Sequence, residues 1–82
     1  MTSAAPPFAV LEAARIQAGM SFQELWIAYL ALGGNAPPDV VRDYLGGSGI
    51  QRSDYDLLAQ ALNERFLDQG QNHPVPYHED LR

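Results

Sequence analysis

The chain has 82 residues, 46% of them hydrophobic, and ten acidic residues against five arginines give it a formal net charge of −5. It contains no cysteine, which excludes a disulfide framework and a cysteine-based zinc site, and no apolar run approaches the roughly 18–20 residues that cross a bilayer. The N-terminus lacks a signal-peptide pattern, so we expect a single acidic, cytoplasmic domain over residues 1–82, and the absence of lysine is typical of GC-rich bacterial genomes.

The N-terminal part of the chain predicts a short leader followed by a helix. Residues 1–6 are expected to be disordered, as unanchored chain ends commonly are. Pro7 suits the first position of a helix, because its missing N–H has no partner there. We therefore predict a helix over residues 7–18 that ends at Gly19. Its apolar side comprises Phe8, Leu11 and Ala14.

Residues 21–33 form the most informative segment, because the predicted helix is apolar on almost every side. Ser21 and Glu24 match the capping box that begins a helix, and Gly33 follows its last apolar residue. The main apolar face comprises Phe22, Leu25, Trp26, Tyr29 and Leu32. The opposite side carries Ile27, Leu30 and Ala31. Such a helix needs burial all round, so we expect it to be the hub of the domain, with Trp26 mostly buried, or to offer its spare face to another chain.

Two further helices are predicted, over residues 37–45 and from Ser53 to about Gln69. Pro37 and Pro38 begin the first of them, and Ser53 is expected to cap the second. The buried side of the first comprises Val40, Val41, Tyr44 and Leu45. The second has an apolar stripe of period 3.6, formed by Tyr55, Leu58, Ala59, Leu62 and Phe66.

The C-terminal residues 71–82 contain Pro74 and Pro76, which prevent a helix there. We predict an extended tail in which Val75 and Tyr77 lie against the helices. No segment alternates with the period of two that indicates a strand. The sequence therefore predicts an all-α fold: a small, four-helix, bundle-like domain with short Gly/Pro turns and an extended C-terminal tail.

The sequence predicts no catalytic, cofactor or metal site. Residue types that bind metals gather in the tail, at His73, His78, Glu79 and Asp80. That segment is interrupted by proline, and ordered metal sites need supporting residues around the ligands. The carboxylate pairs are Asp39 with Asp43, Asp54 with Asp56, and Glu64 with Asp68. We expect these pairs on outer helix faces, without the cleft that acid–base catalysis needs.

Two patterns resemble nucleotide or nucleic-acid sites only in part. The glycine-rich loop 46–49, followed by Arg52, lacks the preceding strand and the motif of a phosphate-binding loop. The two helices within residues 21–45 have the outline of a helix-turn-helix motif. The segment 39–45 would be its recognition helix, but it carries one cation, Arg42, between acids. Phosphate contacts supply most non-specific affinity, so we do not expect nucleic acid as a partner.

Surplus apolar residues therefore carry the functional hypothesis. The candidate interface residues are Ile27, Leu30, Ala31, Leu57 and Leu67. We interpret the chain as a non-enzymatic, regulatory or accessory protein–protein interaction module, which associates with itself or docks on a larger partner. A helix-turn-helix regulator is the alternative. A small-molecule pocket comes third, and its lining would be Trp26, Tyr29 and Tyr44.

Overall fold

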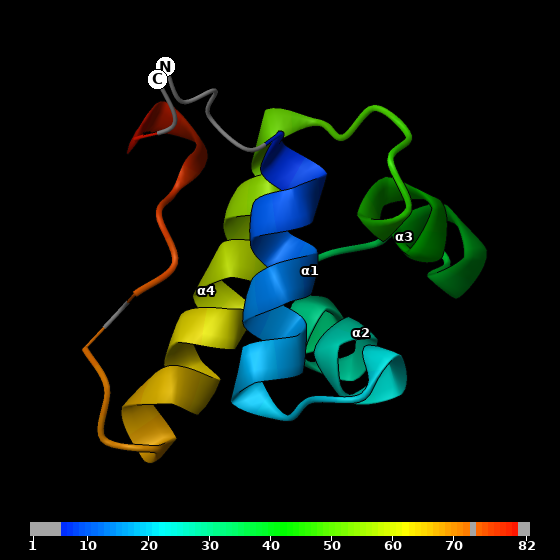
Figure 1. Cartoon of the computed structure of the whole chain (residues 1–82). Helices are drawn as coiled ribbons and strands as arrows, with labels where there is room; N and C mark the ends of the chain where they lie inside the picture. The colour runs from blue at the N-terminus through cyan, green and yellow to red at the C-terminus, as the bar shows by residue number, and fades with distance from the viewer. Residues whose placement is uncertain (1–5, 73, 81–82) are drawn as a thin grey trace.

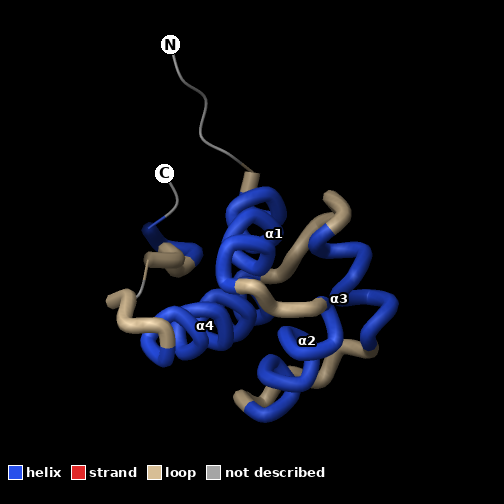
Figure 2. The backbone as a smooth tube through the Cα atoms, turned by 60° about the horizontal axis from the view of Figure 1, so that its bottom comes forward, coloured by secondary structure: helices blue, strands red, loops and turns tan. Residues whose placement is uncertain are grey.

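The computed structural model describes residues 6–72 and 74–80 (Figure 1). These residues form four α-helices, one short 3-10 helix and no strand: α1 (Pro7–Ala18), α2 (Phe22–Ala31), α3 (Pro38–Leu45), α4 (Arg52–Asp68) and η1 (His78–Asp80). Helices α1 and α4 pack together, α2 packs on α4, and α3 packs on α1 and α2 (Figure 2). The predicted all-α, bundle-like fold is confirmed. None of the described helices is long and apolar enough to cross a membrane.

The helix ends follow local signals, with small shifts. The predicted capping box is present: the Ser21 hydroxyl accepts from the Glu24 N–H at 3.1 Å, and the Glu24 carboxylate accepts from the Ser21 N–H at 2.8 Å. Helix α1 ends at Gly19, whose φ of +71° suits glycine. Pro6 occupies the N-cap position of α1 without a side-chain capping bond, and the rest of the expected leader, residues 1–5, lies outside the described residues. Pro37, predicted as the first residue of its helix, occupies the N-cap position of α3.

The expected cap of α4 is wrong. Its N-cap is Gln51, whose side chain makes no capping bond within the described part of the chain. Ser53 is instead the second residue of the helix, which begins at Arg52. The acid in the first turn is Asp54, whose charge favours the N-terminal end of a helix. Helix α4 therefore starts one residue before the expected cap.

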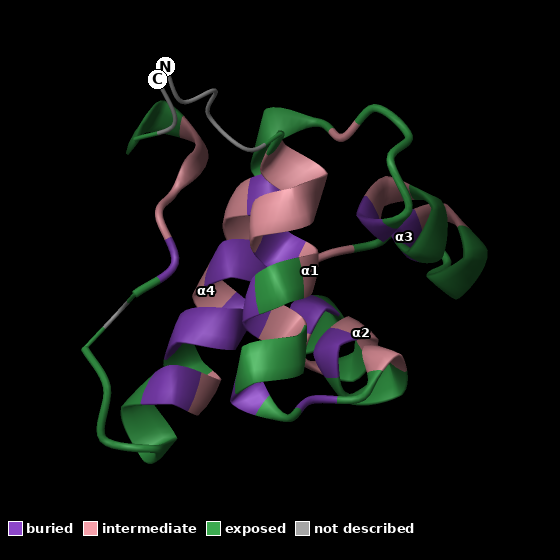
Figure 3. Cartoon of the chain, viewed as in Figure 1, coloured by how far each residue is buried: buried purple, intermediate pink, exposed green. Residues whose placement is uncertain are grey.

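Helix α4, rather than α2, is the hub of the domain. It has 17 residues and packs against α1, α2 and η1. Its buried residues are Tyr55, Leu58, Ala59, Ala61, Leu62, Asn63 and Phe66, so burial runs along most of its length (Figure 3). The 10-residue α2 buries Leu25 and Tyr29 among its residues. The longest helix has the most surface to share with neighbours, so it lies in the centre.

Trp26 is partly buried at the edge of the core, which agrees with the expectation that most of its side chain is covered. Its ring packs against the core, and its indole N–H donates to the Ala36 carbonyl at 3.1 Å. This bond ties the side chain to the segment between α2 and α3, beside the core. An apolar helix face predicts contact with other residues, but it does not decide how deeply each residue is covered.

A polar cluster joins α2, α3 and α4. The Tyr29 hydroxyl donates to Asp54 at 2.8 Å and accepts from the Ala36 N–H at 3.1 Å. The Tyr44 hydroxyl donates to the other oxygen of Asp54 at 3.3 Å. Burial raises the pKa of Tyr29, and the Asp54 carboxylate raises it further. Asp54 therefore fixes three helices relative to one another, in contrast to its expected place on an outer face.

The C-terminal tail lies along α4. The side-chain amide of Asn63 bonds to both the N–H and the carbonyl of Val75, each at 2.9 Å. Val75 is buried and Tyr77 is half-buried against the core, as predicted. The described part of the tail ends in the 3-10 helix η1, which the sequence did not indicate.

Tyr55 gives the tail contact a measurable pH dependence. Burial raises the pKa of Tyr55 from 10.0 to about 12, and the nearby Asp56 and Asp80 carboxylates add to the effect. Its hydroxyl donates to the Pro76 carbonyl at 2.8 Å. The folded state binds the hydroxyl proton of Tyr55 more tightly than the unfolded chain does. The resulting stabilisation of the fold is therefore complete below the pKa of Tyr55 in the unfolded chain, and it is lost as the pH rises through the pKa of Tyr55 in the folded state.

We therefore expect Tyr55→Phe to flatten the alkaline loss of stability between about pH 10 and 12. In the wild type, this group lowers the free energy of unfolding by on the order of 1 kcal/mol per pH unit in that window. Near pH 7 the variant should lose about 1 kcal/mol, because the bond to Pro76 is removed. Urea unfolding at a series of pH values measures both effects, and an unchanged alkaline slope would contradict the assignment.

Candidate functional site

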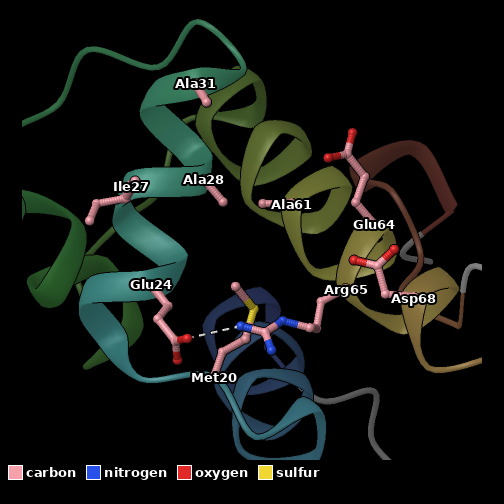
Figure 4. Close-up of a pocket in the computed structure, with 9 residues that line it drawn as sticks. All are labelled: Met20, Glu24, Ile27, Ala28, Ala31, Ala61, Glu64, Arg65 and Asp68. Atoms are coloured by element: carbon pink, nitrogen blue, oxygen red, sulfur yellow. Dashed lines mark hydrogen bonds and ion pairs between the residues drawn. The ribbon is translucent and has the colours of Figure 1, made fainter.

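An open groove of about 370 Å³ lies between α2 and α4 (Figure 4). Its apolar lining comprises Met20, Ile27, Ala28, Ala31 and Ala61. Its charged lining comprises Glu24, Glu64, Arg65 and Asp68. Alanines on both facing helices leave room that larger side chains would fill. The groove therefore has a small-residue apolar floor and a charged border.

Helical spacing places these residues on two facing walls. On α2, Glu24, Ile27 and Ala31 recur at intervals of three and four residues. On α4, Ala61, Glu64 and Asp68 follow the same spacing. Residues at these intervals share one side of a helix. Each helix therefore contributes one continuous wall to the groove.

The border of the groove is predominantly acidic. Arg65 forms an ion pair with Glu24, with 3.1 Å between Nη2 and Oε2 (Figure 4). The pKa of Glu24 is lowered, chiefly by the hydrogen bond from the Ser21 N–H and then by Arg65. Glu64 and Asp68 are exposed, and neither forms an ion pair with another described residue. Three carboxylates thus face one guanidinium, which is already paired.

The structure brings together part of the predicted interface. Ile27 is 54% exposed and lines the groove with Ala31, and Leu30 is 37% exposed on the same helix. Leu67 is 45% exposed on α4, but it is not among the described residues that line the groove. Leu57 is half-buried and packs against the core. Ile27 and Ala31 are therefore the predicted residues that line the groove, and Leu30 is exposed next to them in the sequence of α2.

The sequence analysis did not single out two apolar residues, of which one is exposed away from the groove and the other lies in the groove floor. Ile16 on α1 is 65% exposed, more than the other exposed large apolar residues of the described chain. It lies about 200° around the helix from the buried Ala14, so a helical wheel could have found it. Met20 follows α1 and contributes to the groove floor. No periodic signal marks Met20, because it lies between two helices.

The potential metal ligands of the tail have other contacts. The His78 N–H donates to Asp56 at 2.8 Å, and the His78 ring packs edge-on against Tyr55 with 5.8 Å between ring centroids. Asp80 accepts from the Tyr77 N–H at 3.3 Å. Within residues 6–72 and 74–80, no three His, Cys, Asp or Glu side chains are placed to hold a metal ion. His73 lies outside the described residues.

The candidate nucleic-acid and phosphate residues are also engaged. The guanidinium of Arg42 lies over the Phe22 ring, 4.5 Å from its centroid. Its neighbours Asp39 and Asp43 are exposed on α3. Arg52, which follows the glycine-rich loop, lies 4.0 Å from Glu79 in an exposed ion pair.

The residues of the suggested small-molecule pocket use their polar atoms within the fold. Tyr29 and Tyr44 both donate to Asp54, and Trp26 donates to Ala36.

No protein-family model, curated protein or solved structure matches this chain. The groove between α2 and α4 is therefore the candidate functional site.

Proposed function

We propose that the chain is a non-enzymatic protein-interaction module and that the groove between α2 and α4 is its contact surface. One observation carries this proposal: Ile27, a large apolar side chain, is 54% exposed at the edge of an apolar groove. Leu30 and Ala31 are exposed beside it on α2. Apolar residues that gather at a concave surface are typical of sites where another protein binds. The absence of cysteine suits a reducing cytoplasm, which we include in the proposal.

The proposed partner is an amphipathic helix with basic residues beside its apolar face. The alanine floor allows close approach of a helix backbone, and such helices commonly bind in apolar grooves. Glu64 and Asp68 would attract arginine or lysine on the partner. In a two-fold symmetric dimer that contacts through this groove, the same acidic border would face itself. The charge therefore favours a basic partner over self-association.

We rank a helix-turn-helix function second. The exposed residues of α3 include Asp39, Arg42 and Asp43, which together carry a net negative charge. Arg42 would also have to leave the Phe22 ring in order to reach a phosphate. Both features weaken the electrostatic attraction that DNA-binding helices depend on.

Ile27→Glu tests the groove, with Ile16→Glu as the matched control. Both isoleucines are more than half exposed, so both variants should keep the circular dichroism spectrum of the wild type. Affinity capture with the full chain, followed by quantitative mass spectrometry, should recover a partner with the wild type and with Ile16→Glu. We expect at least a tenfold lower recovery with Ile27→Glu, because the substitution places a charge at the apolar edge of the groove.

The captured protein must also contain a basic amphipathic helix, and its binding should weaken as salt concentration rises. Unchanged capture by Ile27→Glu would refute the groove as the contact surface. Sedimentation velocity on the purified chain examines the self-association alternative. A concentration-dependent dimer that is lost in Ile27→Glu would overturn the choice of a basic partner in favour of a second copy.

A further inference from the structure

The C-terminal tail lies against α4 as an extended peptide lies on its receptor. Asn63 bonds to both backbone groups of Val75, and the Tyr55 hydroxyl bonds to the Pro76 carbonyl. The Asp56 carboxylate accepts from the N–H of His78. All four hydrogen bonds are made to main-chain atoms of the tail, so another extended segment of suitable length can form the same bonds.

Asn63 is the buried polar residue of this contact, at 1% exposure. Burying an amide is unfavourable unless its donor and acceptor are both satisfied. Here one residue of an extended chain satisfies both, in the way that a neighbouring strand would. Asn63 therefore favours a peptide with an extended backbone. The other residues around the tail determine which side chains such a peptide carries.

Open space remains beside Val75. A furrow of about 320 Å³ remains between α1 and the tail, and its lining comprises Ala9, Val10, Ala13, Ala14, Gln17, Phe66, Pro74, Val75 and Pro76. Val75 is 5% exposed, so its side chain already points toward the core. The free space beside it is lined mostly by apolar residues. A longer apolar side chain at this place would bury additional surface.

We propose that the surface of α4 beneath the tail, together with this furrow, is a second binding site, which takes an extended peptide of a partner protein with a leucine-sized residue between two prolines. The chain's own tail is then an internal competitor that covers the site until such a peptide displaces it. The two proposed sites are separate. Asn63 and Ala61 project about 200° apart on α4, so the tail and α2 lie on opposite sides of that helix (Figures 1 and 2).

A labelled peptide tests the proposal with the full chain. The probe is fluorescein-labelled QNHPLPYHED, which is the sequence of residues 71–80 with leucine in place of Val75. Val75→Asp should release the tail, because a carboxylate does not stay buried beside Phe66, and it leaves Asn63 and Tyr55 unchanged. By fluorescence anisotropy, the probe should bind Val75→Asp at least tenfold tighter than the wild type. The leucine probe should bind about fourfold tighter than the valine version, from one added buried methylene.

Three controls make the test specific. The double variant Val75→Asp/Asn63→Leu should bind the probe at least tenfold more weakly than Val75→Asp, and a probe with aspartate at the leucine position should not bind. Ile27→Glu in the Val75→Asp background should leave probe binding unchanged, which separates this site from the α2–α4 groove. Circular dichroism checks that each variant is folded, and Val75→Ala replaces Val75→Asp if the latter unfolds.

Equal affinity of the single and double variants, or no binding to a folded variant with a released tail, would overturn the proposal. A second measurement does not depend on substitution of the chain. Addition of the leucine probe to isotopically labelled wild type should shift the NMR signals of the Asn63 side-chain amide and of the Val75 N–H. Absence of these shifts at millimolar probe would count equally against the proposal.

Discussion

Gly34→Ala is expected to destabilise the chain by about 3 kcal/mol, at the upper end of the usual cost of overpacking. A Cβ atom at this position would overlap the Tyr29 ring. The ring cannot easily move away, because Tyr29 is 0% exposed and its hydroxyl is bonded to Asp54 and Ala36. Relief of the overlap would require the loss of these bonds or a shift of the turn between α2 and α3.

Gly49→Ala is the matched control for this prediction. A Cβ atom at Gly49 would meet nothing within 4 Å, and its backbone is not in the left-handed region. Its stability should therefore stay within about 0.5 kcal/mol of the wild type. Urea unfolding, followed by circular dichroism, measures both variants. Equal stability of Gly34→Ala and Gly49→Ala would show that the Tyr29 ring is not held as described.

Phe66→Ala should cost about 3–5 kcal/mol, which is most of the stability of a small domain. Phe66 is 1% exposed on the hub helix α4. Removing its ring leaves a cavity that the surrounding helices can close only in part. Thermal and urea unfolding should show midpoints far below those of the wild type.

Trp26→Ala is the informative comparison, because tryptophan is the larger side chain but lies at the edge of the core and is not fully buried. We expect a loss of about 1–3 kcal/mol from its covered surface and its bond to Ala36. The order of the two losses distinguishes the two possible hubs. A greater loss for Trp26→Ala than for Phe66→Ala would return α2 to the centre of the domain.

The exposed side of the candidate groove was predictable, whereas its opposite wall was not. Ile27 and Ala31 lie away from the main apolar face of their helix, and helical periodicity alone shows this. That Glu64 and Asp68 would face them across a groove depends on how α2 and α4 pack. Leu57 was also predicted as an interface residue, yet it packs against the core. A helical wheel drawn for one helix does not show which of its residues a second helix covers.

The sequence by itself determined where the helices lie, because the responsible interactions span only a few residues. The Ser21–Glu24 capping box, the left-handed Gly19 and Pro38 at the start of α3 act through the local backbone. Only the tertiary structure decided that α4 is the hub, that Asp54 binds two tyrosines, and that Asn63 holds the tail. Tyr29 and Asp54 are 25 positions apart in the chain, and Asn63 and Val75 are 12 apart. Their pairing depends on which helices bury the most apolar surface together, a property of the whole fold that no local pattern contains.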